Sequence, residues 1–207
     1  MQAMQATQVR TKSFVLKGGP QSGKSTILRE LERVFGEQII VVPEVATVLL
    51  THLWPKRDLA GLKNDTWMHT LQHGIYHTQL GLGRLAKERA EVSGCSLIGY
   101  DRGVFDNAGY LGISGRELAA MFGADFDELM GMYDLVIHLD TLARLHPENF
   151  GSETNEARYE TPEEAIAVDE QIWRAYEEHP HHVRIVACDD FDAKTQQVVD
   201  LVRELLN

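Results

Sequence analysis

Residues 18–25 carry a glycine-rich pattern, GGPQSGKS, that matches a phosphate-binding loop. Gly18 and Gly23 allow positive φ and close approach of a ligand, so that successive backbone N–H groups can turn toward an anion. Lys24 is then expected to reach the β- and γ-phosphates of a nucleoside triphosphate, and the Ser25 hydroxyl is expected to bind Mg²⁺. The alternative is a chance match in a surface glycine turn.

The residues around this pattern favour nucleotide binding. A short apolar run precedes it at 13–17, and apolar residues at helical spacing follow it over 26–35. A strand, a glycine loop and a helix in this order are the context that the motif requires, because the helix N-terminus adds partial positive charge. We therefore expect ATP and Mg²⁺ as cofactors. The expected nucleotide contacts are Gly19, Gln21, Ser22, Gly23, Lys24, Ser25 and Thr26.

Two charged residues, Asp101 and Arg102, come directly after the apolar run 97–100. An acid at the carboxyl edge of a parallel sheet lies where ligands bind in open α/β folds, so Asp101 is expected to hold Mg²⁺ directly or through water. Arg102 is expected to offset charge on the transferred phosphate. A simple ion pair between the two residues is the alternative.

A third charged residue, Glu44, follows the apolar run 39–42 and Pro43. At this place a carboxylate can face an acceptor substrate and orient or deprotonate its attacking hydroxyl. The alternative is an acid that complements the dipole of a following helix at 45–53. We favour the acceptor role, because the loop at 18–25 and Asp101 indicate the same edge of a sheet.

The composition is typical of a soluble globular protein, with 43% hydrophobic and 25% charged residues. The net charge of −11 disfavours non-specific contacts with nucleic acids or with an anionic membrane, because both need Lys and Arg. Cys95 and Cys188 lie in apolar runs and are expected to be small buried hydrophobes. No secretory signal and no apolar run of membrane-spanning length is seen, so a cytoplasmic location is expected.

The remaining sequence supplies the elements that must position these side chains. Five apolar runs have strand length: 13–17, 38–42, 95–100, 135–139 and 183–188. Helical patterns lie between and after them, at 24–35, 45–53, 65–91, 114–122, 162–178 and 191–205. This alternation predicts one α/β domain over 1–207, a five-stranded parallel sheet with helices on both faces.

The segment 141–161 interrupts the alternation. It is polar and has no clear period, and a segment of this length inside a compact domain is usually functional. We expect an active-site lid. Arg144 and Arg158 are its basic candidates for stabilising charge on the γ-phosphate when the site closes, with Arg158 preferred. Solvated arginines paired with nearby glutamates are the alternative.

Together these motifs resemble the deoxynucleoside kinase group of P-loop kinases. In that group the acid after the second strand is the general base for a sugar hydroxyl, and an acid–arginine pair after the third strand lies beside it. The resemblance implies these roles for Glu44 and for Asp101 with Arg102. The WMHTLQ stretch at 67–72 is similar to the group's base-recognising helix, which implies Gln72, or Gln79 as second choice, as a substrate contact.

The chain resembles the NadR/TTD-type (AAA-like) P-loop ATPase family more closely, a family that includes ribosylnicotinamide kinase domains. The resemblance covers nearly the whole chain, through GGPQSGKS at 18–25, PEVAT at 43–47, DRG at 101–103 and RYETPEEA at 158–165 with Asp169. It implies the fold of a P-loop NTPase, with a nucleoside-kinase-like arrangement and ATP binding.

We therefore expect an ATP-dependent, Mg²⁺-requiring phosphotransferase acting on a nucleoside-like small molecule. The alternatives are a nucleotide-driven regulatory module and a plain NTPase. An acceptor pocket between Glu44, Gln72 and Asp101 would favour the kinase. The expected partners are the nucleotide and the acceptor, and a homodimer stays open. His69, His73 and His77 share one helix face, but they lack a metalloprotease pattern and are expected to be partly buried or to face a pocket rather than bind metal.

Overall fold

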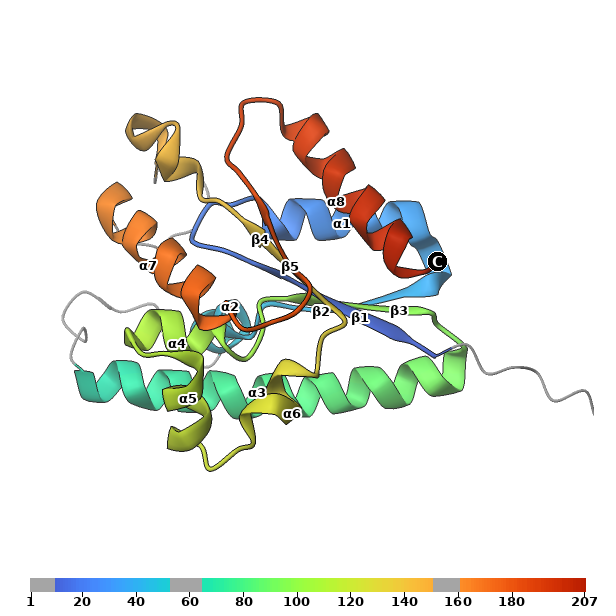
Figure 1. The fold of residues 1–207 in the computed structure, drawn as a ribbon, viewed down its shortest axis with the longest axis horizontal. Coiled ribbons are helices and arrows are strands. Elements are labelled where there is room, and N and C mark those ends of the chain that lie inside the picture. Colours follow the sequence, from blue (N-terminus) through green and yellow to red (C-terminus); the bar gives the residue numbers. More distant parts are fainter. Residues whose placement is uncertain (1–9, 53–64, 151–160) are drawn as a thin grey trace, which may run out of the picture.

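The computed structural model describes residues 10–52, 65–150 and 161–207, and these form a parallel sheet between two layers of helices (Figure 1). The predicted five-stranded parallel α/β fold of a P-loop NTPase is confirmed. The strands are β1 (Lys12–Lys17), β2 (Ile39–Val42), β3 (Leu97–Asp101), β4 (Leu135–Leu139) and β5 (His182–Ile185).

The sheet has the strand order β2-β3-β1-β4-β5, so the chain begins in its centre. β1 pairs with β3 on one side and with β4 on the other, and all pairs are parallel. The strand order reverses at β1. The loop after β1 therefore lies at the topological switch point, the place where ligands bind in open parallel sheets.

Helices cover both faces of the sheet (Figure 1). The helices α1 (Lys24–Phe35) and α8 (Phe191–Leu205) lie on one face, and α3 (Asp65–Ser93) lies on the other with the short helices α4 (Asp106–Leu111), α5 (Gly115–Met121) and α6 (Phe126–Met130). The helix α2 (Val45–His52) packs against α3, and α7 (Pro162–Ala175) packs against α4. The core follows the strand alternation, since Phe14 and Leu16 face α1 and α8 while Val15 faces the α3 layer.

The structure corrects several predicted boundaries. β5 ends at Ile185, and Val186, which is 63% exposed, follows it. The runs that contain Cys95 and Cys188 were therefore predicted too long: both cysteines lie outside strands, half-buried and free of disulfides. The sequence patterns predict neither α4 nor α6, which have 6 and 5 residues. In addition, α4 buries the polar residues Asp106 and Asn107 and so lacks an apolar stripe.

The segment after β4 is more regular than predicted. Residues 141–150 form two short 3-10 turns, η3 (Leu142–Arg144) and η4 (Pro147–Asn149). The rest of the predicted lid, 151–160 with Arg158, lies outside the described residues. No helix in the described ranges combines the length and the apolar character that a membrane crossing needs.

Candidate functional site

The loop between β1 and α1 is held by groups that turn its carbonyls outward. The carbonyls of Pro20, Gln21 and Ser22 each accept a hydrogen bond from outside the loop. The donors are the Thr141 hydroxyl at 2.5 Å, the Leu142 N–H at 3.2 Å and the Lys194 ammonium at 3.1 Å. Because N–H and C=O of a trans peptide point in opposite directions, the N–H groups that follow these carbonyls turn inward. The loop backbone therefore has the form of an anion-binding concavity.

Two glycines of the motif are required by this geometry. Gly18 has φ +139°, and a Cβ there would lie 2.1 Å from the Leu139 carbonyl oxygen. Gly23 has φ +89°, and a Cβ there would lie 2.7 Å from the ring of Phe191. Any larger residue would push the loop off β4 or off α8, so the sequence pattern encodes how closely the loop packs.

Lys24 lies across the loop that it follows. Its ammonium donates to the carbonyls of Gly18 at 3.0 Å and Gly19 at 2.9 Å, and to the Ser22 hydroxyl at 2.9 Å. The side chain is 6% exposed. Burial and the neighbouring Arg102 guanidinium lower the pKa of Lys24 to about 8, against the fields of Asp101 and Glu44. The lysine is thus a cation whose present oxygen acceptors can be replaced by phosphate oxygens, as phosphate binding requires.

Ser25 and Asp101 meet beside this lysine. The Ser25 hydroxyl donates to Asp101 Oδ2 at 2.7 Å, which brings together the end of β3 and the first turn of α1. Asp101 Oδ1 is buried and has no hydrogen-bond partner among the described residues. Burial raises the pKa of Asp101, against the field of Lys24. A hydroxyl and a carboxylate with an unused oxygen fit the hard ligand preference of Mg²⁺.

Arg102 pairs with Glu44 rather than with its neighbour Asp101. Arg102 has φ +70°, a left-handed conformation that is uncommon outside glycine, and its Nε donates to Glu44 Oε1. The Thr47 hydroxyl donates to Glu44 Oε2 at 2.8 Å. Burial would raise the pKa of Glu44, but Arg102 and Lys24 overcome this and lower it to about 2. Glu44 is therefore a carboxylate at neutral pH.

Four buried side chains lie around the Arg102–Gly103 segment: Asp106, Asn107 and Tyr176, which the sequence motifs did not indicate, and Gln79, the second choice for a substrate contact. Asp106 Oδ2 lies 3.9 Å from Arg102 Nη1, and its Oδ1 accepts from the Tyr176 hydroxyl at 2.9 Å. Gln79 donates to the Gly103 carbonyl at 3.2 Å and accepts from Asn107 at 2.8 Å. The only sequence signal for Asp106 and Asn107 was their position as a polar pair in an otherwise apolar stretch.

Gln72 is buried on α3, with 4% of its surface exposed. Its amide donates to Met68 Sδ at 3.6 Å, one turn away on the same helix. Within the described part of the chain, no hydrogen bond joins Gln72 to Glu44 or to Asp101. The geometry thus brings Glu44 and Arg102 together, and Ser25 and Asp101 together, while the substrate contact of Gln72 stays a prediction.

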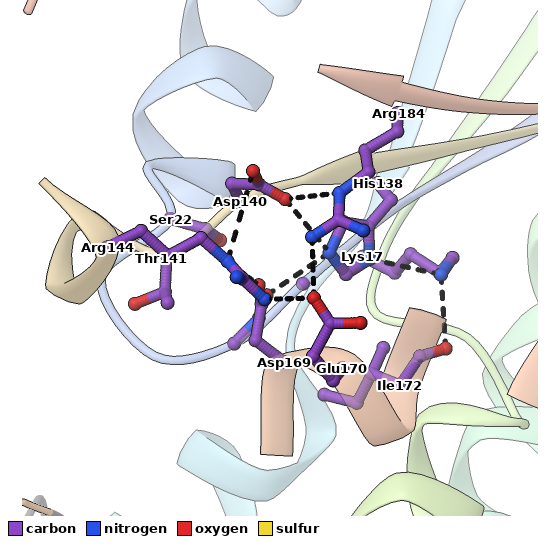
Figure 2. Close-up of polar contacts among 12 residues, drawn as sticks. Lys17, Ser22, His138, Asp140, Thr141, Arg144, Asp169, Glu170, Ile172 and Arg184 are labelled. Carbon is purple, nitrogen blue, oxygen red and sulfur yellow. Dashed lines mark hydrogen bonds and ion pairs between the residues drawn. The ribbon is translucent and has the colours of Figure 1, made fainter. Parts of the chain in front are cut away.

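A second charged cluster lies on the other side of the loop, where β4, β5 and α7 meet (Figure 2). Arg144, the described lid candidate, donates from Nε to Asp169 Oδ2 at 3.1 Å and from Nη2 to Glu170. Arg184 also donates to Glu170, at 2.8 Å, and to Asp140 at 2.7 Å. The described partners of Arg144 therefore come from α7 and from Asp140, whose Oδ2 lies 3.9 Å from Arg144 Nε, while Glu153, Glu156 and Glu160 lie outside the described residues.

The histidine stripe of α3 packs against an aromatic side chain. His73 and His77 are exposed, and their ring centroids lie 4.6 and 5.6 Å from that of Phe122. Within the described ranges, the only group of three or more His, Cys, Asp or Glu side chains close enough to share a metal ion is His138, Asp140 and Asp169, which the sequence patterns did not indicate as metal ligands.

The switch-point loop, the lysine across it and the serine–aspartate pair together define a P-loop NTPase. A family model described as an AAA domain matches residues 13–194, and the chain belongs to this family. The AAA-like part of the resemblance is thereby confirmed, and a P-loop domain of this family points to nucleotide binding. No curated protein matches the chain.

Proposed function

We propose that this protein is an ATP-dependent, Mg²⁺-requiring phosphotransferase, related to the NadR/TTD-type kinases, that acts on a hydroxyl of a nucleoside-like small molecule. The observation that carries the proposal is the ionised Glu44 carboxylate, which is held by Arg102 at the edge of the sheet that also holds Lys24 and Asp101. A protein that only binds a nucleotide would not need the pair of Glu44 and Arg102 beside its phosphate-binding loop.

The residues of the loop would bind the triphosphate. The inward N–H groups and the Lys24 ammonium would contact its oxygens, with Lys24 leaving the Gly18 and Gly19 carbonyls to do so. Ser25 and Asp101 would hold Mg²⁺, which supplies charge compensation on the β- and γ-phosphates. Arg102 Nη1 is buried without a hydrogen-bond partner among the described residues, so it can donate to a phosphate oxygen while Nε stays on Glu44.

Glu44 would orient the acceptor hydroxyl. A carboxylate with a pKa of about 2 is a weak base, so early removal of the hydroxyl proton is unfavourable. Phosphoryl transfer passes through a loose transition state in which the acceptor oxygen bonds late. Glu44 can then accept the proton as the oxygen loses its basicity, and before that step its main contribution is alignment.

Apolar side chains at the same edge support a site for the base. Leu145, Val186 and Phe191 are 40, 63 and 39% exposed, and Phe191 lies against Gly23 of the loop. His146 Nε2 and Asp189 Oδ1, 2.6 Å apart, join the segment after β4 to the connection before α8. By analogy with other P-loop proteins, the purine would lie against this surface.

One observation favours a second candidate function, a nucleotide-driven switch or plain NTPase. Both oxygens of Glu44 already accept hydrogen bonds from the chain itself, from Arg102 and Thr47. These bonds use one lone pair on each oxygen and hold the carboxylate toward the protein, and if they persist with ATP bound, the role of Glu44 would be to hold Arg102.

The substitution Glu44→Gln separates the two functions. A thermal-shift screen of nucleosides with a non-hydrolysable ATP analogue identifies the acceptor, since a ligand of the folded state raises stability. For the phosphotransferase, Glu44→Gln should leave ATP affinity almost unchanged and lower single-turnover transfer by about a hundredfold. The matched control is Glu32→Gln on the exposed face of α1. Unchanged transfer, or a screen without any acceptor, would favour the switch.

A further inference from the structure

One buried carboxylate connects three separate parts of the nucleotide site. Asp169, on α7, is fully buried. Its Oδ1 accepts from the Gly19 N–H at 2.7 Å and lies 3.2 Å from His138 Nε2, while its Oδ2 accepts from Arg144 Nε at 3.1 Å (Figure 2). Asp169 thus contacts the phosphate-binding loop, β4 and the segment after β4, although 150 residues separate it from Gly19.

The contact with Gly19 sets the orientation of a peptide that also holds Lys24. The Gly18 carbonyl and the Gly19 N–H belong to the same peptide group and point in opposite directions. The N–H donates to Asp169, so the carbonyl points the other way, where it accepts from the Lys24 ammonium at 3.0 Å. Asp169 therefore influences the orientation of Lys24 indirectly, through the peptide group between Gly18 and Gly19.

The loop is also pressed against α7 at this point. A Cβ on Gly19 would lie 3.0 Å from Asp169 Cβ and 3.1 Å from the Ala165 carbonyl oxygen. Such close packing leaves the Gly19 N–H little freedom to find another acceptor. The position of α7 and the charge on Asp169 therefore both act on the start of the loop.

Asp169 is ionised in this arrangement. Burial would raise its pKa, but His138, the Gly19 amide and Arg144 overcome this and hold the pKa well below its usual range. Burial lowers the pKa of His138 to about 4, so the ring is neutral near pH 7. Lys17 Nζ lies 3.1 Å from His138 Nδ1, and in its ammonium form Lys17 can only donate there, which places the ring proton on Nε2, facing Asp169.

The same residues, with Asp140, also have the spacing of metal ligands, and the charges around them argue against a metal. Both oxygens of Asp169 already accept from N–H donors, and Asp140 Oδ1 accepts from Arg184 at 2.7 Å. Three cationic side chains, Lys17, Arg144 and Arg184, surround the group and would repel a divalent cation.

We propose that Asp169 is a positioning residue of the nucleotide site. Its carboxylate fixes the Gly18–Gly19 peptide so that Lys24 points across the loop, and it holds Arg144 beside the same loop. This inference rests on the nucleotide-binding part of the proposed function and is independent of transfer to an acceptor.

Three variants test this role. Asp169→Ala removes the acceptor, and Asp169→Asn keeps an oxygen that can accept from Gly19 while losing the charge. Glu170→Gln is the matched control, because Glu170 lies next to Asp169 on α7 and also binds Arg144 but does not bind the loop. The measurements are the affinities for Mg-ATP and for adenosine, the Gly19 amide proton resonance, and the free energy of unfolding without nucleotide.

For a positioning role, Asp169→Ala should weaken Mg-ATP about tenfold or more, leave adenosine almost unchanged and move the Gly19 amide resonance upfield. Asp169→Asn should recover most of the ATP affinity, and Glu170→Gln should change it less than about twofold. A purely structural role predicts a lower free energy of unfolding with unchanged ATP affinity in the folded variants, and this result would overturn the proposal.

Three further outcomes have separate meanings. If Asp169→Ala does not fold, the nearly isosteric Asp169→Asn decides: full ATP affinity together with a displaced Gly19 resonance contradicts the role. Zn²⁺ or Mn²⁺ that perturbs the His138 ring resonances of the parent protein would replace the proposal with a metal site. A parent protein that binds adenosine but not ATP would refute the nucleotide function itself.

Discussion

A cluster of charged side chains lies on each side of the phosphate-binding loop, and the two clusters differ in how many of their polar atoms are hydrogen-bonded. On the side of β2 and β3, the acceptor-side cluster consists of Glu44, Asp101, Arg102 and Asp106. On the side of β4 and β5, the scaffold cluster consists of His138, Asp140, Arg144, Asp169, Glu170 and Arg184 (Figure 2). Both place arginines among buried carboxylates at the same edge of the sheet.

The difference lies in which atoms remain unpaired. In the acceptor-side cluster, Asp101 Oδ1, Arg102 Nη1 and Asp106 Oδ2 are buried without a hydrogen-bond partner in the described part of the chain. In the scaffold cluster, Arg144 and Arg184 both donate to Glu170, and each also binds a second carboxylate. In the scaffold cluster, the described residues leave one such atom, His138 Nε2, which lies 3.2 Å from Asp169 Oδ1. Unpaired buried polar atoms are costly, so the larger number of them on the acceptor side favours a ligand there, whereas the mostly paired network favours a fixed scaffold.

Removing Lys24, which lies between the clusters, should have the largest effect. Lys24→Ala deletes the cation that the loop presents to phosphates, so the affinity for Mg-ATP should fall by at least about a hundredfold. Binding is measured by titration calorimetry, with the exposed Lys87→Ala on α3 as the control. ATP affinity equal to that of the parent would remove the loop from the nucleotide site.

Replacing one arginine in each cluster compares the acceptor-side cluster with the scaffold cluster directly. Arg102→Met leaves Glu44 and Asp106 buried without their cation and should lower the free energy of unfolding by about 3–5 kcal/mol. Arg144→Met should cost only about 1–2 kcal/mol, because Arg184 stays on Glu170 and Asp140 and the Gly19 amide stays on Asp169.

Urea unfolding of both variants without nucleotide measures this difference. The exposed pair Arg116–Glu178 supplies the control, since Arg116→Ala breaks the same chemistry in water and should leave stability nearly unchanged. Equal losses for Arg102→Met and Arg144→Met would mean that the two clusters do not differ in redundancy.

The smallest effect is expected in the pH dependence of the free energy of unfolding, which depends on Lys17 beside the scaffold cluster. Burial lowers the pKa of Lys17 to about 7 in the folded protein, from 10.5. Between these values the unfolded chain binds more protons, so the free energy of unfolding should rise with pH, by up to about 1.4 kcal/mol per pH unit. Lys24 adds a similar rise that starts about one pH unit higher, since its own pKa is about 8, so Lys17 should contribute the larger share of the rise between pH 7 and 8.

Lys17→Met tests this assignment. It removes the titrating group from the buried position beside His138, so the rise between pH 7 and 8 should largely disappear. Lys87→Met on the exposed face of α3 should keep the rise of the parent protein. A rise that survives in Lys17→Met would assign the proton to another group.

Three of the four acceptor-side residues could be predicted, because Glu44, Asp101 and Arg102 stand at the ends of strands. Glu44 and Asp101 directly follow or end apolar runs, and parallel strands bring their carboxyl ends to one edge. The pairing of Arg102 with Glu44 could not be predicted, because it depends on the left-handed backbone of Arg102 and on Gln79 and Asp106 behind it. The buried polar face of α4 lacked the apolar stripe that identifies a helix.

The sequence by itself determined the loop at 18–25, the helix after it and the parallel sheet, because these depend on local properties: glycine conformations, apolar period and strand ends. Tertiary structure alone decided that Asp169 orients the Gly18–Gly19 peptide and that Arg144 binds α7. These contacts join residues that are 150 and 25 positions apart, and they exist only because α7 packs beside β4 and the loop. Periodicity along a chain predicts which face of a helix is buried, but the partner that a buried charge meets depends on how distant elements pack.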